Sequence, residues 1–273
     1  MRVAFLGQIG SHSEGAALEY AGAALEAVPC ESFGAVFAAV AAGSADRAVL
    51  PIENAWAGSI HSNYDLLLQH DLYIVGELSC YIRHNLLALP GVELAAIRRV
   101  WSHPQALDQC AAYLAGLRVT REAVADTTAA ARRVRDEQRH DTAAIASLRA
   151  AALYGLVPLA AGIEDSADNY TRFLILAREP GPPPTGRLAK TSLVFSLEHV
   201  PGALYQALAV FARRGLNLTK IESRPLRGRR WEYLFYLDFT AAPADPAPGA
   251  ALAELQMLAP FLRVLGVYTQ DAR

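Results

Sequence analysis

The chain has 273 residues, 53% of them hydrophobic, and a mean hydropathy of +0.17, so it can bury a large core in about two domains of ~100–200 residues each. The formal net charge is −2 and the pI about 6.4, without a basic block, which argues against nucleic-acid binding through a broad positive patch. No uncharged stretch approaches the ~18 apolar residues of a membrane span, and no export signal opens the chain, so we expect a cytoplasmic protein without membrane contact.

The first polar turn follows a predicted strand, Arg2–Leu6, and precedes an Ala-rich helical run. Ser11 and Glu14 in this turn have the spacing of a capping box, so we expect Ser11 to be the N-cap of the helix. Ser13 lies beside it. A helix N-terminus presents unpaired N–H groups and the positive end of the helix dipole, so the turn predicts an anion site.

Three further strands lead through polar turns into helical segments, and each turn supplies a candidate N-cap. The pairs are Ala48–Ile52 with Ser59, Val100–Trp101 with Ser102, and Ala143–Ala146 with Ser147. In the turn after Val100–Trp101, Gln105 completes a capping box with Ser102, and Pro104 lies in the first turn of the helix. Several such helix ends on one side of a parallel sheet would hold a small dianion with few lysines, although serine caps are also common for structural reasons alone.

A hydroxyl and a guanidinium stand side by side where a polar loop enters the apolar strand Phe173–Ala177. Open α/β folds bind ligands at strand ends. Thr171 is therefore a candidate donor to a leaving oxygen, and Arg172 is a candidate for bidentate carboxylate binding. A structural ion pair is the alternative for Arg172.

The element pattern changes at a Pro-rich stretch. Up to about residue 178, strands alternate with helical segments, as in a mostly parallel α/β sheet. Beyond it we expect strands at 191–197, 216–223, 231–239 and 263–268, helices at 202–214 and 252–258, a turn at 227–229 and a loop at 241–248. This βαββαβ order is typical of a ferredoxin-like unit. We predict domains 1–179 and 190–270, joined by a linker at 180–189.

Five stretches occur in an order that resembles one enzyme family with its regulatory domain. The first three resemble prephenate dehydratases and the last two resemble the phenylalanine-binding motifs of ACT domains: Pro51–Asn54 with Gly58–Ser59, Ser102–Leu107, Asn169–Phe173, Gly202–Leu204 and Glu222–Pro225. The resemblance runs from Val3 to about Tyr268. It implies a two-lobed, periplasmic-binding-protein-like α/β catalytic domain followed by a ferredoxin-like ACT domain.

The resemblance also implies the reaction, in which prephenate loses carbon dioxide and its ring hydroxyl to give phenylpyruvate in L-phenylalanine biosynthesis, without a cofactor or metal. Thr171 matches the family's essential threonine. The candidate substrate-binding residues are Arg172, Asn54, Ser59, Ser11, Ser13, His103, Gln105 and Phe173. The alternatives are an arogenate dehydratase, which performs the same chemistry on the amino analogue, and a non-catalytic small-molecule sensor.

For the C-terminal domain the resemblance implies feedback regulation by L-phenylalanine at an interface between paired ACT domains, in a homodimer or homotetramer. The candidate effector-binding residues are Gly202, Ala203, Leu204, Asn217, Leu218, Glu222, Ser223 and Arg224. The chain departs from the family pattern at Gln8, at His12 where an aromatic residue is usual, at Ala55 where a serine is usual, and at Tyr205.

The sequence does not contain the motifs of several other common kinds of site. Gly7 and Gly10 follow a strand but do not form the Gly-x-Gly-x-x-Gly of dinucleotide sites. Asp165 and Asp168 are two loop acids of the kind that form turns rather than hold a metal. Three widely spaced cysteines, at positions 30, 80 and 110, exclude a disulfide framework and a cysteine zinc site.

Overall fold

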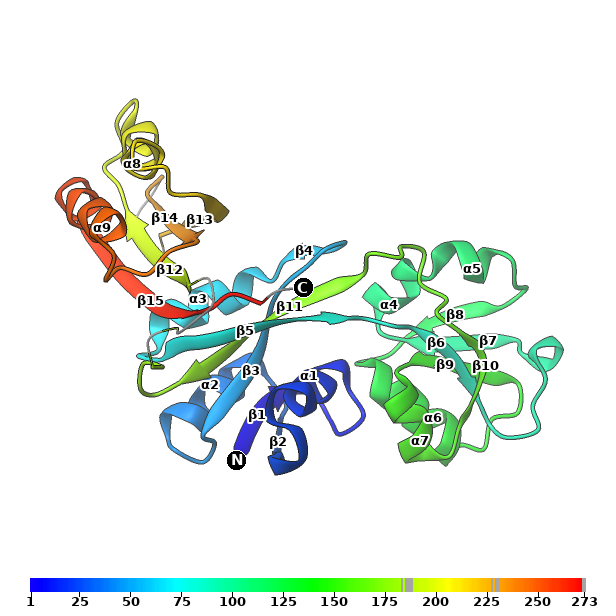
Figure 1. The fold of residues 1–273 in the computed structure, drawn as a ribbon. Helices are drawn as coiled ribbons and strands as arrows, with labels where there is room; N and C mark the ends of the chain where they lie inside the picture. Colours follow the sequence, from blue (N-terminus) through cyan, green and yellow to red (C-terminus); the bar gives the residue numbers. More distant parts are fainter. Residues whose placement is uncertain (183, 185–188, 227, 229–230, 272–273) are drawn as a thin grey trace. The chain divides into compact units, whose positions relative to one another are not determined.

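A computed structural model describes residues 1–182, 184, 189–226, 228 and 231–271. The chain divides into two compact units. The first unit consists of Met1–Ile60 and Ser79–Phe173, and the second of His61–Leu78 and the chain from Leu174 onward. Figure 1 labels the helices and strands of both units.

The first sheet has the strand order β2-β1-β3-β11-β5, with the short β4 paired to β3. Its strands are β1 (Arg2–Leu6), β2 (Glu26–Cys30), β3 (Arg47–Asn54), β4 (Gly58–Ser59), β5 (Tyr73–Tyr81) and β11 (Tyr170–Ala177). The helical segments that follow β1 and β2 are α1 (His12–Ala21), η1 (Gly22–Ala24) and α2 (Phe33–Ala41). Strand β1 lies between β2 and β3 and pairs in parallel with both, as the alternation of strands and helices predicts.

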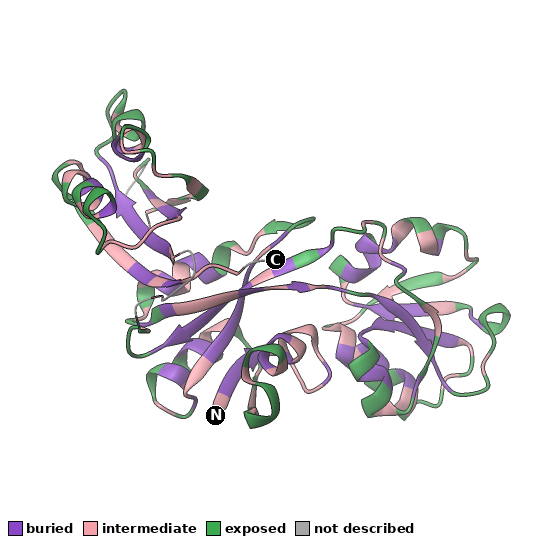
Figure 2. Ribbon diagram, viewed as in Figure 1, coloured by how far each residue is buried: buried purple, intermediate pink, exposed green. Residues whose placement is uncertain are grey.

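The second sheet has the order β10-β6-β9-β7-β8. Its strands are β6 (Asn85–Ala88), β7 (Arg99–Ser102), β8 (Thr120–Ala123), β9 (Thr142–Ala146) and β10 (Val157–Ala161). Its helical segments are η2 (Leu94–Ala96), α4 (Pro104–Gln109), α5 (Ala111–Ala115), α6 (Thr127–Asp136) and α7 (Leu148–Tyr154). The middle strand β9 is buried along its whole length, with one apolar cluster around Ala143 and Ile145 and another around Ala144 and Ala146 (Figure 2). The two sheets are the two lobes of an α/β fold of the periplasmic-binding-protein type.

A ferredoxin-like βαββαβ unit follows, as predicted. Its elements are β12 (Ala189–Ser196), α8 (Ala203–Ala212), β13 (Leu218–Pro225), β14 (Tyr233–Phe239), α9 (Pro246–Leu258) and β15 (Phe261–Thr269). The sheet is antiparallel, with order β13-β14-β12-β15. Helix α9 begins at Pro246 rather than at the predicted residue 252, because prolines are tolerated in the first turn of a helix. The predicted loop at 241–248 is therefore shorter.

The segment His61–Leu78, which includes α3 (His61–Gln69), packs within the second unit. The hydroxyl of Tyr236 donates to the carbonyl of Tyr64 at 2.7 Å, and Arg224 pairs with Asp65 at 3.2 Å. A Cβ added at Gly266 would collide with the carbonyl oxygen of Ile74. Residues 183 and 185–188 of the predicted linker, and 227 and 229 of the predicted turn, lie outside the described residues.

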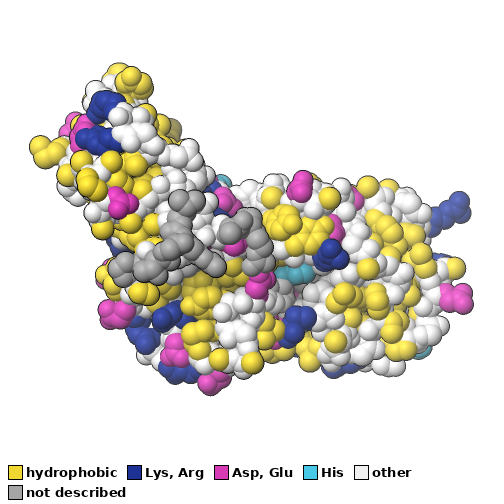
Figure 3. Space-filling model, viewed as in Figure 1, with side chains coloured by type: hydrophobic (Ala, Val, Ile, Leu, Met, Phe, Trp, Pro, Cys, Tyr) yellow, Lys and Arg dark blue, Asp and Glu magenta, His cyan; other side chains and the backbone are white. Residues whose placement is uncertain are grey.

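The described surface carries charges of both signs. Figure 3 shows one face, on which Lys and Arg side chains lie in small separate groups rather than in one broad patch. Among the described residues, no helix is both long and apolar enough to cross a membrane. All three cysteines are free thiols, and Cys80 and Cys110 are buried.

Candidate active site

Two of the four predicted N-caps are confirmed. Ser11 accepts a hydrogen bond from the backbone N–H of Glu14 at 3.1 Å, and Ser147 accepts from that of Ala150 at 3.0 Å. The carboxylate of Glu14 accepts from the N–H of Gly10 at 2.8 Å, so the glutamate of the capping box also holds the backbone of the preceding turn. These contacts fix the turn at the start of α1.

The other two N-cap predictions are wrong, because tertiary pairing uses the serines. Ser59 lies in β4 and pairs with Glu53 across a tight hairpin, and α3 begins only at His61. Ser102 is fully buried and donates to the carbonyl of Ile145 at 2.7 Å. The N-cap of α4 is His103, whose Nδ1 accepts from the N–H of Gln105 at 3.3 Å. Pro104 occupies the first turn of α4, as predicted.

A cavity of about 500 Å³ lies in the first unit, with wall residues from both lobes. Eight of the nine predicted catalytic and substrate-binding residues line it: Ser11, Ser13, Asn54, Ser59, His103, Gln105, Thr171 and Phe173. Residues as far apart in the sequence as Leu6 and Phe173 thus line the same cavity.

Arg172 is the predicted residue that does not line this cavity. Side chains alternate between the two faces of a strand, so Thr171 and Phe173 share one face of β11 and Arg172 lies on the other. Its guanidinium pairs with the carboxylate of Glu53 at 2.6 Å. This arrangement favours the structural ion pair over carboxylate binding.

Asn54 organises the turn beside the threonine. Its Oδ1 accepts from the backbone N–H groups of Trp56 and Ala57, at 3.0 and 2.9 Å, which fixes the orientation of the amide. Its Nδ2 then donates to the carbonyl of Tyr170 at 3.1 Å and to Oγ1 of Thr171 at 3.0 Å. Because the Thr171 oxygen accepts this bond, the hydroxyl proton is free to be donated elsewhere.

A chain of amides extends from Asn54 to a buried imidazole. Asn169 donates from Nδ2 to the carbonyl of Ile82 at 3.2 Å, so its Oδ1 faces the network and accepts from Nδ2 of Asn54 at 2.9 Å. Gln109 Nε2 lies 3.4 Å from Oδ1 of both asparagines, so its Oε1 faces Nε2 of His84 at 2.7 Å. Since an amide oxygen only accepts, these partners assign the His84 proton to Nε2 and leave a lone pair on Nδ1.

Two neutral histidines line the cavity. The rings of His12 and His84 meet edge to face with centroids 5.5 Å apart. Burial, with a smaller contribution from the neighbouring His84, lowers the pKa of His12 to about 3. Burial also lowers the pKa of His84, although its hydrogen bond to Gln109 opposes the shift. Near neutral pH both rings are therefore uncharged hydrogen-bonding groups.

The N-termini of two ten-residue helices contribute to the wall. Ser11, His12 and Ser13 lie at the start of α1, and Asp126 and Thr127 lie at the start of α6. Among the described residues that line the cavity there is neither Lys nor Arg. The positive potential on this wall therefore comes from helix dipoles and N–H groups, which suits a small carboxylate ligand.

The sequence prediction does not include Gln109, His84 or Asp126. Gln109 lies one helical turn after Gln105, so helical spacing places both on one face of α4. Asp126 caps α6 by accepting from the N–H of Ala129 at 2.7 Å, so the rule that identifies Ser11 also identifies it. His84 has no comparable local signal, since its role depends on a residue 25 positions away.

The acidic loop has a structural function. The carboxylate of Asp165 accepts from the backbone N–H of Ala112, with oxygens at 3.0 and 3.1 Å, and the carbonyl of Asp168 accepts from that of Tyr170 at 3.0 Å. In the part of the chain that the structure describes, no group of three or more His, Cys, Asp or Glu residues is arranged to hold a metal.

The predicted effector residues lie in two places in the second unit. Gly202 precedes α8 with a φ of +84°, and Ala203 and Leu204 begin that helix and line a small cavity of about 120 Å³. Asn217 accepts from the N–H of Thr240 and directly precedes β13. The remaining predicted residues lie on β13: Leu218, Glu222, Ser223 and Arg224.

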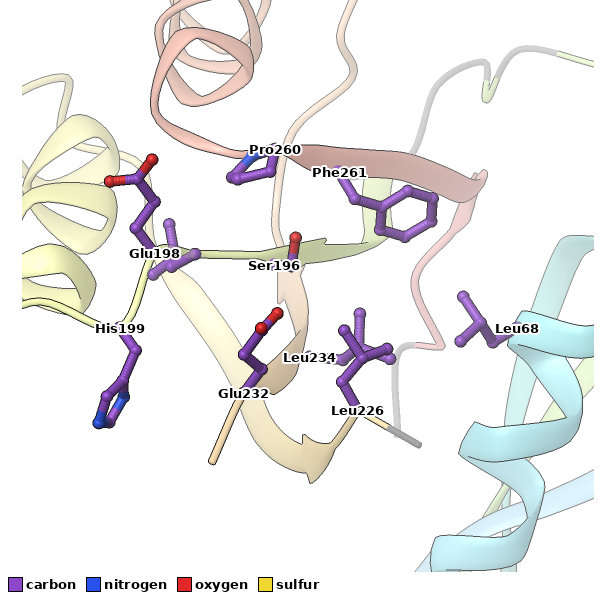
Figure 4. A pocket seen from close by; sticks show the side chains of 10 residues that line it. Leu68, Ser196, Glu198, His199, Leu226, Glu232, Leu234, Pro260 and Phe261 are labelled. Carbon is purple, nitrogen blue, oxygen red and sulfur yellow. The ribbon is translucent and has the colours of Figure 1, made fainter. Parts of the chain in front are cut away.

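On β13, Glu222 and Arg224 face the segment 61–78. Glu222 lies 3.2 Å from Nε2 of His61, and Arg224 pairs with Asp65. A larger cavity of about 680 Å³ in the same unit combines apolar and polar side chains (Figure 4), among them Leu68, Ser196, Glu198, Leu226, Glu232 and Phe261. None of the eight predicted effector residues lines this larger cavity.

Comparison with known proteins agrees with the architecture. The family model for prephenate dehydratase matches residues 3–181, and that for the ACT domain matches residues 191–256. A relative named arogenate dehydratase/prephenate dehydratase 2, chloroplastic, from Arabidopsis thaliana is 55% identical over 99% of this chain and 73% of its own length.

Two solved structures cover nearly the whole chain. The prephenate dehydratase from Arthrobacter aurescens in complex with L-Phe has a TM-score of 0.91 and 35% identity over 99% of this chain and 90% of its own. A structure described as GqqA, a novel type of quorum quenching acylase, has a TM-score of 0.91 and 36% identity over 100% of this chain and 99% of its own.

The cytoplasmic location predicted from the sequence is wrong on this evidence, because relatives matched over almost the whole chain are named chloroplastic. These relatives are longer than this chain, which spans 73% and 72% of their lengths. With the family model matched over the two-lobed domain and the ACT model over the ferredoxin-like unit, the chain belongs to the prephenate dehydratase family of hydro-lyases.

Proposed function

We propose that this enzyme catalyses the decarboxylating dehydration of prephenate to phenylpyruvate, or of its amino analogue arogenate to phenylalanine, under feedback control by L-phenylalanine. The observation that carries the proposal is the Thr171 hydroxyl on the cavity wall, whose oxygen accepts from Asn54 while its proton remains available. The names of the relatives, which include both prephenate and arogenate dehydratase, support both substrates.

The reaction breaks two bonds that join substituents to the substrate ring. The ring carboxylate leaves as carbon dioxide, its bonding electron pair enters the ring, and the ring hydroxyl departs with one proton as water. Aromatisation drives the step, so the enzyme must orient the carboxylates and stabilise the departing oxygen. We assign the second task to Thr171, as a positioned hydrogen-bond donor rather than as a strong acid.

The cavity wall supplies the other requirements. We assign the carboxylates of the substrate to the N-terminus of α1 and to the hydroxyls of Ser11, Ser13 and Ser59, which line the cavity. His103 and Gln105, on the opposite lobe, and the apolar Phe173 complete the wall. Apolar surface beside the ring carboxylate favours its loss, because carbon dioxide is uncharged whereas the carboxylate needs solvation.

We also propose that catalysis and regulation reside in separate stretches of the chain, a catalytic domain at 1–179 and an ACT domain at 190–270. The matched residues 3–181 and 191–256 support this division. We further propose a homodimer or homotetramer with L-phenylalanine bound between ACT domains. A related structure in complex with L-Phe supports the identity of the effector.

Steady-state turnover of prephenate and of arogenate, each with and without L-phenylalanine, tests the proposal. We expect ring-aromatised product from at least one substrate and a lower rate when phenylalanine is present. Binding of either substrate without turnover would instead identify a sensor. Turnover that phenylalanine does not change would refute the regulatory part alone.

A further inference from the structure

The charges on the cavity wall are unbalanced. Asp126 is the only acidic residue among the described residues that line the cavity, and neither Lys nor Arg accompanies it there. His12 and His84 contribute no positive charge near neutral pH, because burial lowers the pKa of each ring. The wall thus presents a carboxylate with no cationic side chain to neutralise it.

Only one of the two carboxylate oxygens of Asp126 is used in capping the helix. Its Oδ1 accepts from the N–H of Ala129 at 2.7 Å as the N-cap of α6, and the residue is half buried. Within the described chain, no salt bridge or second hydrogen bond engages the other oxygen. The position of this oxygen is nevertheless fixed, since the cap bond and the helix hold the carboxyl group in place.

The two candidate substrates differ in one group on the side chain. Prephenate carries a ketone, which accepts hydrogen bonds but has no proton to donate, and it is a dianion. Arogenate carries an ammonium in place of the ketone, so it has three N–H donors and a net charge of −1. A carboxylate accepts a charge-assisted hydrogen bond from an ammonium, whereas it repels a ketone oxygen.

We propose that Asp126 is a specificity-determining residue, which binds the ammonium of the amino substrate and gives this enzyme a preference for arogenate over prephenate. The inference rests on the proposed function, because it assigns the substrate to this cavity. Asp126 plays no part in the bond-breaking steps. It acts by raising the efficiency of one substrate relative to the other.

The test is the ratio of kcat/KM on arogenate to kcat/KM on prephenate, measured in the wild type and in Asp126→Asn. Asparagine caps helices as well as aspartate does, so α6 keeps its cap while the charge is lost. A hydrogen bond to a charged group contributes ~1.5–3 kcal/mol, so we expect the ratio to fall about 10–100-fold.

The control is Asp245→Asn, which removes the same charge at the N-cap position of α9, a residue that does not line the cavity. Its ratio should equal that of the wild type. A ratio unchanged in Asp126→Asn, or an equal loss on both substrates, would overturn the proposal. The wild type is assayed on both substrates before any variant is made. If it turns over neither substrate, the proposed function is refuted, and the proposal for Asp126, which depends on it, is refuted too.

Discussion

Nδ2 of Asn54 donates a hydrogen bond to Oγ1 of Thr171 across 3.0 Å, although 117 positions separate the two residues. The bond occupies a lone pair of the threonine oxygen and turns the hydroxyl proton away from Asn54. It also makes the oxygen a better donor, because accepting a hydrogen bond polarises the O–H group. The asparagine is in turn held by two backbone N–H groups, so the hydroxyl is oriented before any ligand arrives.

This geometry predicts the effect of removing the hydroxyl. Thr171→Ala should fold normally and lose about 10²–10³-fold in kcat, the scale for one preorganised donor. Thr171→Ser should retain part of the activity, because its hydroxyl can accept from Asn54 in the same way. Steady-state kinetics with melting curves measure both, and near-normal turnover by Thr171→Ala would remove the threonine from the mechanism.

Arg172 and Glu53 should behave as a structural pair. Arg172→Gln and Glu53→Gln should each lower the free energy of unfolding by about 1.5–3 kcal/mol, the range for a hydrogen bond to a charged group. The double variant should lose less than the sum of the two, since the second change removes a group that is already unpaired. Denaturant titration gives these values. An Arg172→Gln protein with wild-type stability and a raised KM would instead restore its role in substrate binding.

His12 should make stability depend on pH. Its pKa is about 3 in the folded protein, against ~6.5 for an unfolded imidazole. As the pH falls below ~6.5 the unfolded chain takes up a proton that the folded chain refuses, so stability is lost progressively towards pH 3. Between pH 7 and 5 this loss amounts to about 2 kcal/mol for one such histidine.

The variant His12→Phe should remove that part of the pH dependence, and an aromatic residue is usual at this place in the family. Melting temperatures at pH 7, 6 and 5 provide the comparison. His140→Phe, a change at an exposed surface position that retains His12, is the matched control and should keep the wild-type trend. An equally steep loss in His12→Phe would mean that another group titrates.

A substitution at Gly202 tests the proposed phenylalanine site. Its φ of +84° disfavours any side chain, and a Cβ there would meet nothing within 4 Å, so Gly202→Val strains the backbone without a clash. We expect this variant to lose inhibition by phenylalanine. Gly215, with φ +65° and equally open surroundings, is the control: Gly215→Val should cost a similar ~1–2 kcal/mol yet remain inhibited.

Equal loss of inhibition in both variants would indicate general damage to the domain rather than to a binding site. Full inhibition of Gly202→Val would mean that phenylalanine binds elsewhere. Calorimetric titration of phenylalanine into each variant separates loss of binding from loss of coupling between the two sites.

Local rules account for what the sequence predicted correctly about the site. A capping serine bonds to an N–H only three residues away, so Ser11 and Ser147 can be identified without a fold. The βαββαβ order was likewise readable, because each strand and helix carries its own apolar period. Strand alternation is just as local, and it would have separated Arg172 from Thr171 on β11.

Tertiary contacts account for the errors. Ser59 has the local surroundings of an N-cap, but pairing with Glu53 draws it into a strand. The hydroxyl of Ser102 donates to the carbonyl of Ile145, which lies 43 positions away. The contact between His84 and Gln109 likewise exists only after two distant segments meet. A single sequence contains no signal for such pairings, whereas it contains every residue needed for a helix cap.

The placement of residues 61–78 bears on attempts to free the enzyme from feedback by truncation. A cut in the Pro-rich segment would remove β12 to β15 but leave behind the helix and strand that pack against them. Asp65 would lose Arg224, Glu77 would lose Lys190, and the backbone at Tyr64 and Ile74 would lose the close cover of Tyr236 and Gly266. The shortened protein would therefore expose two carboxylates and backbone that the removed strands cover, and it should aggregate. Point substitutions that leave this packing intact are the sounder route to a deregulated enzyme.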